Sequence, residues 1–309
     1  MSTLLSPLAS IAHLALALAL APLLPGVINR TKAWFAGRRG PPLLQTYYDL
    51  RKLLQKGAVY SRTTNWVFIA GPIVQLACVS VALLIVPLGG VPGLLAFSGD
   101  FLFLAYLLGL LRFVMVVAAL DTGSSFEGMG ASREVFFSAL AEPAMLLGLT
   151  ALAAHAQSLS LSAIYAAIGT HASLLSAGPA MLLVAAALGI VFLTENARIP
   201  VDDPNTHLEL TMIHEVMVLD HSGPDLAMIQ YGAALKLWVL GALLVGIVVP
   251  IRTGSGALDL LTGVGGMLLL AVVTGVIESS MARLKLLRVP QFLVAASVLS
   301  ILALVLVMR

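Results

Sequence analysis

The chain has 309 residues, of which 60% are hydrophobic and 10% are charged, with a formal net charge of +2 and a mean hydropathy of +1.02. Because an average soluble domain carries about 25% charged residues, this composition excludes an ordinary soluble protein, and the small net charge provides no basic surface for nucleic acid. Apolar runs close to the roughly 20 residues that cross a bilayer as a helix predict an all-α integral membrane protein, with eight spans in one bundle. The predicted spans are 4–27, 66–88, 101–120, 138–157, 179–194, 232–250, 256–277 and 290–308.

The basic residues between these spans predict the orientation of the bundle. The positive-inside rule places the basic connections in the cytoplasm. Both termini then face outside, and the long polar connections lie on the cytoplasmic side of the cell inner membrane. An uncharged stretch at 158–178 would admit a ninth span, but that span would move Arg283, Lys285 and Arg288 outside, so eight spans fit better. Thirteen of the 17 Lys and Arg residues lie in alternate connections: Arg30, Lys32, Arg38, Arg39, Arg51, Lys52, Lys56, Arg62, Arg133, Arg198, Arg283, Lys285 and Arg288.

The first long connection contains a short amphipathic segment. Residues 43–56 place apolar side chains, from Leu43 to Leu54, at helical spacing, and charged residues such as Lys52 and Lys56 follow a second stripe. Fourteen residues are too few to span a bilayer. The pattern predicts an interfacial helix whose basic face meets lipid headgroups or a soluble partner, or which serves only as a surface anchor.

The ionisable residues Arg112, Glu142 and Lys236 lie within the predicted spans. Burying an ionised side chain in hydrocarbon costs several kcal/mol unless the group is paired or hydrated. We therefore expect all three side chains to face the interior of the bundle. They form either an ion pair that fixes the register of the helices or part of a path for protons or ions.

Further acids lie in two cytoplasmic connections. The connection 121–137 contains Asp121, Glu127 and Glu134 among glycines that favour tight turns, and we expect it to be a loop. It should abut the segment 195–223, which emerges on the same face and has a predicted helix at about 205–219. The acids and histidines of that segment are Glu195, Asp202, Asp203, His207, Glu209, His214, Glu215, Asp220 and His221.

These side chains do not match a metal site. His207 and His214 are seven residues apart, which separates them by about 10.5 Å along a helix, and the HExxH pattern is absent. Cys78 is the only cysteine, so the chain cannot hold an iron–sulfur cluster by itself. Any redox metal must therefore belong to a partner. Carboxylates and imidazoles suit a water-linked proton relay, and a polar docking surface for a soluble subunit is the alternative; both can hold.

Four long motifs carry a resemblance to a known family. They are RRGPPLLQTYYDLRKLL from Arg38, LDTGSSFEGMGASRE from Leu120, ENARIPVDDPNTHLELTMIHE from Glu195 and ESSMARLKLLRVP from Glu278. Over nearly its whole length the chain resembles the membrane subunit that joins the two arms of respiratory complex I. It is more similar to the corresponding subunit of group 4 membrane-bound nickel–iron hydrogenases, of the formate hydrogenlyase and hydrogenase-4 type.

The resemblance implies a subunit without a cofactor or catalytic residues of its own. Such a subunit holds a peripheral arm, with a nickel–iron large subunit and an iron–sulfur small subunit, and opens a proton path toward antiporter-like membrane subunits. Where complex I relatives have further acids after Pro204, this chain has Asn205 and His207, which disfavours a quinone acceptor. The candidate proton pathway comprises Glu142, Glu195, Asp202, Glu209, Arg198, Arg112, Lys236, Asp121, Glu134, His207 and His214.

Two other functions stay open. One is a quinone-binding subunit of a complex I-like NADH:quinone oxidoreductase. The other is a stand-alone ion transporter, which the uneven distribution of polar connections and the lack of matching inverted halves disfavour.

Overall fold

The computed structural model describes residues 2–202 and 213–309, and within these residues every regular element is a helix. Long helices are expected because lipid offers no hydrogen bonds to the backbone, so each segment must satisfy its own. Seven described helices are long and apolar enough to cross a membrane, and a bent pair at the N-terminus makes an eighth candidate span. The seven are α4 (Trp66–Ile85), α5 (Asp100–Asp121), α6 (Ser125–Ala156), α8 (His171–Glu195), α9 (Gly223–Val248), α10 (Gly256–Ser280) and α11 (Val289–Met308).

The first span is bent, so the prediction of one helix over 4–27 is wrong. Helix α1 (Ser2–Leu20) and helix α2 (Leu23–Phe35) meet at an angle of 50°. Pro22 lies at the break, where proline lacks the N–H that would continue the α1 hydrogen bonds. Helix α2 then crosses α10 closely at Gly275, where an added Cβ would lie 2.7 Å from Thr31 Cβ.

Two short helices agree with the sequence. The amphipathic segment forms α3 (Gln45–Leu54), which packs against α9 and α2. The stretch 158–178 contains α7 (Leu161–Ile168), whose eight residues are too few for a ninth span. The Tyr165 hydroxyl donates a hydrogen bond to the Leu243 carbonyl at 2.7 Å, which fixes α7 against α9.

The expected loop at 121–137 is mostly helical. Helix α6 begins at Ser125, so Glu134 lies on a helix and is buried rather than in a solvated loop. Gly130 serves close packing instead of a turn. A Cβ at this position would come within 2.2 Å of Val216 Cγ1 and 2.9 Å of the Ile213 carbonyl oxygen.

The prediction of a helix at 205–219 is wrong where the structure describes the chain. Residues 213–219 contain only the short 3-10 helix η1 (Glu215–Val218), and 205–212 lie outside the described residues. The segment is held by contacts with α6 and α5 rather than by regular helical hydrogen bonds of its own. It packs against one end of the bundle through the buried side chains of Ile213, Val216 and Met217.

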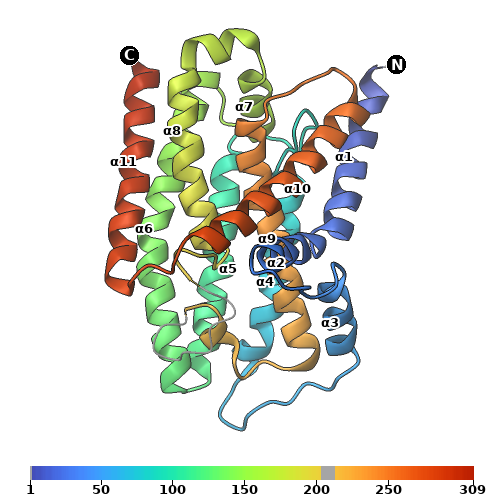
Figure 1. Ribbon diagram of the computed structural model, residues 1–309, viewed down its shortest axis with the longest axis vertical. Coiled ribbons are helices and arrows are strands. Elements are labelled where there is room, and N and C mark those ends of the chain that lie inside the picture. Colours follow the sequence, from blue (N-terminus) through green and yellow to red (C-terminus); the bar gives the residue numbers. More distant parts are fainter. Residues whose placement is uncertain (1, 203–212) are drawn as a thin grey trace.

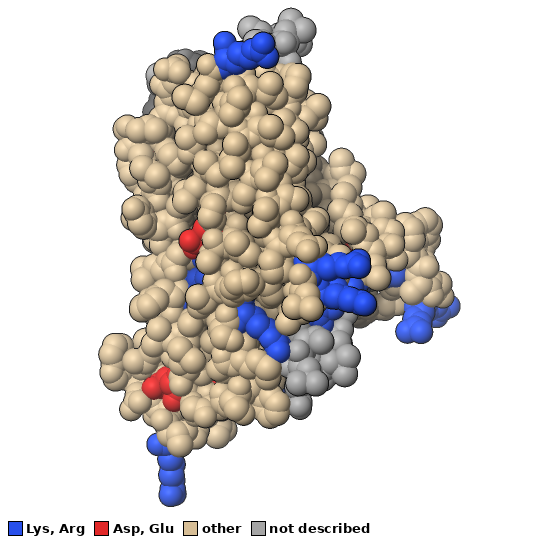
Figure 2. Space-filling view, turned by 90° about the vertical axis from the view of Figure 1, so that its left-hand side faces the viewer, with Lys and Arg blue, Asp and Glu red and all other residues tan. Residues whose placement is uncertain are grey.

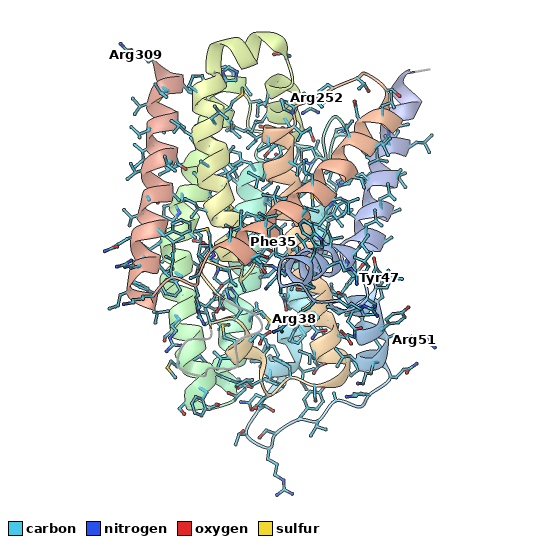
Figure 3. All side chains as sticks on the ribbon, viewed as in Figure 1. Phe35, Arg38, Tyr47, Arg51, Arg252 and Arg309 are labelled. Carbon is cyan, nitrogen blue, oxygen red and sulfur yellow. The ribbon has the colours of Figure 1, made fainter. Side chains whose placement is uncertain are left out.

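Both chain ends lie at the same end of the bundle, as Figure 1 shows. Arg252 and Arg309 lie toward that end, whereas Arg38 and Arg51 lie in the opposite half (Figure 3). On the face shown in Figure 2, most Lys and Arg side chains gather in the lower half, and a broad region above them carries almost no charge. This distribution agrees with basic and apolar zones stacked along the membrane normal.

Helices α6 and α11 pack side by side and run in the same direction along the bundle (Figure 1). Their lengths can therefore be compared with the thickness of the hydrocarbon layer. The 20 residues of α11 span about 30 Å, which matches the hydrocarbon thickness. The 32 residues of α6 span about 48 Å. The surplus lies at the N-terminal end of α6, because Phe137 and Ala141 pack in one cluster with Val289 and Leu293 at the start of α11.

Candidate functional site: a buried network of charged side chains

Arg112 of α5 lies at the centre of the candidate site. Its guanidinium Nη2 donates a hydrogen bond to Glu195 Oε1 at 2.7 Å, and its Nε lies 3.4 Å from Glu134 Oε1. The Nη1 atom forms an ion pair with Glu142. The residue is only 8% exposed. Three carboxylates from α6 and α8 therefore surround one buried cation, as expected for a charge at membrane depth.

Glu195, at the end of α8, extends the network toward α9. Its Oε2 lies 2.8 Å from Lys236 Nζ, so the carboxylate is held between two cations. Both Glu195 and Lys236 are buried. The structure thus pairs Lys236 with Glu195, whereas Glu142 is paired with Arg112.

Glu134 extends the network toward the end of the bundle opposite the two chain ends, where the 213–222 segment lies (Figure 1); this end is called the polar end below. Its Oε2 lies 3.0 Å from His214 Nε2, and His214 Nδ1 lies 3.3 Å from Asp202 Oδ2. Asp202 Oδ1 accepts a hydrogen bond from Arg283 at 3.0 Å. A continuous series of charged or titratable side chains therefore runs from Lys236, inside the bundle, to Arg283 near its polar end.

The network is electrically balanced when His214 is protonated. Burial alone would lower the pKa of His214, but the adjacent Glu134 and Asp202 carboxylates outweigh it and raise the pKa to about 10. Burial also opposes ionisation of Asp202, yet the hydrogen bond from His214 and the charge of Arg283 hold its pKa below the usual range. With His214 charged, four cations then face the four carboxylates of this network.

This geometry determines what the network can do. A carboxylate held between cations favours its charged form and takes up a proton reluctantly. A proton can therefore pass along the series only when a cation moves away from its acid or a neighbouring charge changes. Coupled ion pairs of this kind make proton uptake sensitive to the arrangement of the helices that carry them.

A second buried cluster was missed in the sequence. Glu278, at the end of α10, lies 2.7 Å from Lys32 Nζ and 3.4 Å from Arg198 Nη1 and is 5% exposed. It joins the bent helix α2 to α10 and to the turn after α8. Among the sequence candidates, Arg198 therefore belongs to this cluster rather than to the Arg112 network. An acid at the end of an apolar span was the available signal, because such a residue needs a buried partner.

The remaining sequence candidates lie elsewhere. Asp121 accepts hydrogen bonds from Asn65, from its backbone N–H at 2.6 Å and its side-chain Nδ2 at 2.8 Å, and so ties the end of α5 to the start of α4. His207 and Glu209 lie outside the described residues. Across the described part of the chain, no group of three or more His, Cys, Asp or Glu side chains is arranged to hold a metal ion.

The fold and the network define a multi-pass helical membrane protein with a series of ionisable groups inside its bundle. Residues 8–308 match the protein-family model described as NADH dehydrogenase, and the chain belongs to this family. The match covers all seven long helices and all but the start of the bent first span.

Individual relatives agree with this assignment. The chain is 32% identical over 274 residues to formate hydrogenlyase subunit 4 of Escherichia coli (strain K12), covering 87% of this chain and 88% of that protein. It is 31% identical over 282 residues to hydrogenase-4 component C of the same organism, covering 89% and 87%. These matches confirm the resemblance that the four sequence motifs indicated.

A solved structure shares the fold. The match is to a chain in the structure of the membrane-bound sulfane sulfur reductase, an archaeal respiratory membrane complex, with a TM-score of 0.76. It covers 96% of this chain and 98% of that chain, at 21% sequence identity. The two chains therefore share one fold over nearly their whole length.

Proposed function

We propose that this chain is the membrane subunit of an energy-converting nickel–iron hydrogenase of the formate hydrogenlyase type. In this role it anchors a peripheral redox arm and provides a proton pathway that couples electron transfer to ion translocation. The full-length similarity to formate hydrogenlyase subunit 4 and hydrogenase-4 component C supports the assignment over a quinone-reducing enzyme or a stand-alone transporter.

The buried series from Lys236 to Arg283 is the observation that carries the proton pathway. Its members come from four helices and two connecting segments, so a movement of any one of them changes the ion pairs of the next. Such a movement would change the proton affinity of the carboxylates, because each loses or gains an adjacent cation. In this way a change of charge at the polar end can alter the proton affinity of carboxylates in the interior of the bundle.

The partners follow from the same proposal. The polar end of the bundle, with α3 and the 213–222 segment, binds the soluble nickel–iron and iron–sulfur subunits, which hold all the redox centres. Antiporter-like membrane subunits continue the proton path. The polar end lies in the cytoplasm and both termini lie outside, in agreement with the basic connections.

Glu134 offers a direct test because it bridges Arg112 and His214. In the purified complex, Glu134→Gln keeps the size of the side chain but removes its exchangeable charge. Proton movement in proteoliposomes should fall about 100-fold, the scale on which single proton-transfer groups act, while nickel and iron content stays unchanged. The matched control is Asp220→Asn, which removes an exposed acid at the same polar end.

Two results would contradict the proposal. One is a Glu134→Gln complex that assembles fully and moves protons as fast as the unaltered complex. The other is a tagged chain that is purified under mild conditions as a stable protein without nickel or iron.

A further inference from the structure

Helices α8 and α10 border a groove on the outer side of the bundle. Both helices pack on α9, but α10 runs obliquely and separates from α8 toward the end where the two termini lie (Figure 1). The groove between them has a volume of about 200 Å³. An added Cβ on Gly189, which lines the groove from α8, would meet no atom within 4 Å, so this space is open to a ligand.

The groove suits hydrocarbon rather than water. It is lined by apolar side chains and by Thr274, whose hydroxyl already donates a hydrogen bond to the Leu270 carbonyl at 2.8 Å. A buried water molecule needs about two to four polar partners, and a void left empty loses the dispersion contacts of its lining. A transmembrane helix, about 10 Å in diameter, is too wide for this volume. An acyl chain is the component of a bilayer that fits.

The groove ends where a basic connection passes α8. Its lining reaches Leu193, two residues before the end of α8. The connection 281–288, between α10 and α11, lies against the turn after α8, because the Leu284 N–H donates a hydrogen bond to the Pro200 carbonyl at 2.9 Å. Ile190 of the groove and Leu284 also pack against the same apolar cluster at the start of α11. The polar end of the groove and this connection are therefore neighbours.

Two cations of this connection are available to a ligand. Lys285 and Arg288 are exposed and form no ion pair within the part of the chain that the structure describes, whereas Arg283 is paired with Asp202. Leu287, between the two cations, is 88% exposed. Basic side chains beside an exposed apolar residue are typical of the boundary between hydrocarbon and headgroups. Cations at this depth attract the phosphate of anionic phospholipids.

We infer that the α8–α10 groove binds an acyl chain of an anionic phospholipid whose phosphate lies against Lys285 and Arg288. The groove provides affinity for the chain, and the two cations select the headgroup. A quinone does not match this site, because its neutral head gains no ion pair from the two cations. The inference goes beyond the proposed function and does not depend on it, since it requires only that the chain spans a membrane.

The test of the groove measures lipid affinity in the complete complex. The complex in detergent is titrated with phosphatidylglycerol or phosphatidylcholine, and native mass spectrometry gives the fraction with bound lipid. Gly189→Leu, or Ala186→Leu on the same wall, should lower the affinity for both lipids about tenfold, which corresponds to the loss of roughly two buried methylene groups. Gly265→Leu is the matched control, because Gly265 lies on α10 outside the groove with open space around it.

A second pair of variants tests the headgroup. Lys285→Gln combined with Arg288→Gln should lower the affinity for phosphatidylglycerol about 30-fold, because each basic side chain near a charged headgroup contributes roughly fivefold. The affinity for phosphatidylcholine should stay unchanged. Lys56→Gln combined with Arg62→Gln is the matched control, since it removes the same charge from exposed positions of another connection.

Three results would overturn the inference. Both groove variants could bind phosphatidylglycerol as tightly as the unaltered complex, or the Lys285 and Arg288 variant could lose no more affinity than its control. Alternatively, a quinone rather than a phospholipid could co-purify with the unaltered complex and be lost from Gly189→Leu. None of these results depends on the nickel and iron content of the complex, which tests the proposed function separately.

Discussion

Replacing Glu195 by Gln should destabilise the bundle through Lys236. Within residues 2–202 and 213–309, Lys236 has one ion pair, to Glu195 at 2.8 Å, whereas Arg112 retains Glu134 and Glu142. The substitution removes one charge of a buried pair and strands the ammonium group. Such a loss costs about 3 to 5 kcal/mol, which corresponds to a Tm decrease of roughly 6 to 20 °C.

A second substitution tests this reasoning. Adding Lys236→Met removes the stranded charge, so the double variant should regain about 0.5 to 3 kcal/mol relative to Glu195→Gln, the usual size of coupling between residues in contact. The assay is thermal unfolding of the detergent-purified complex at pH 7, read as the Tm of each variant. A double variant that is less stable than Glu195→Gln alone would refute the pairing.

Two further predictions concern topology and pH. With Cys78 replaced by Ser, single cysteines at the exposed positions Ser98 and Lys56 should react with a membrane-impermeant thiol reagent from opposite sides of the membrane; labelling from one side would contradict the eight-span topology. Because the folded pKa of His214 is about 10, against an ordinary 6.5, the stability it provides is complete below pH 6.5 and is lost as pH rises through 10. Tm should therefore fall over that interval, and His214→Gln should remove the decline; an equal decline in both proteins would exclude His214 as its source.

The sequence predicts the spans because hydropathy alone determines which segments can lie in lipid. It does not predict how a span is shaped. The break at Pro22 divides the first span. The direction of α2 after the break depends on its packing against α10 at Gly275, which the sequence does not show. The start of α6 was predictable in principle, since Ser124 and Glu127 form the S-x-x-E pattern of a helix N-terminus. The nearby glycines instead favour turns in the sequence, whereas in the structure Gly130 allows the close contact of α6 with η1.

The sequence likewise predicts only part of the candidate site. The cost of a buried charge predicts that Arg112 and Lys236 have partners, and both do. It cannot predict which partners, because the choice depends on the rotation of each helix about its axis. The pairing of Arg283 with Asp202 is a contact between residues 81 positions apart. No local pattern encodes such a contact, so the polar end of the network emerges only from the fold.

The depth of Glu142 in the bundle has an electrical consequence. Its neighbours on α6 are Ala141, which clusters with Leu293 of α11, and Ala144, whose carbonyl accepts a hydrogen bond from Ser300. At 1.5 Å per residue, Glu142 therefore lies roughly 6 to 16 Å from the start of α11, which spans about 30 Å. A membrane potential of 100 mV is worth about 2.3 kcal/mol for one charge that crosses the whole bilayer. If the field falls evenly over the length of α11, a proton that reaches Glu142 from the polar end crosses roughly a fifth to a half of the field, which is worth about 0.5 to 1.2 kcal/mol. The movement of a proton between the polar end and Glu142 should therefore depend on the membrane potential, whereas proton movement between groups at the polar end, such as His214 and Asp202, should not.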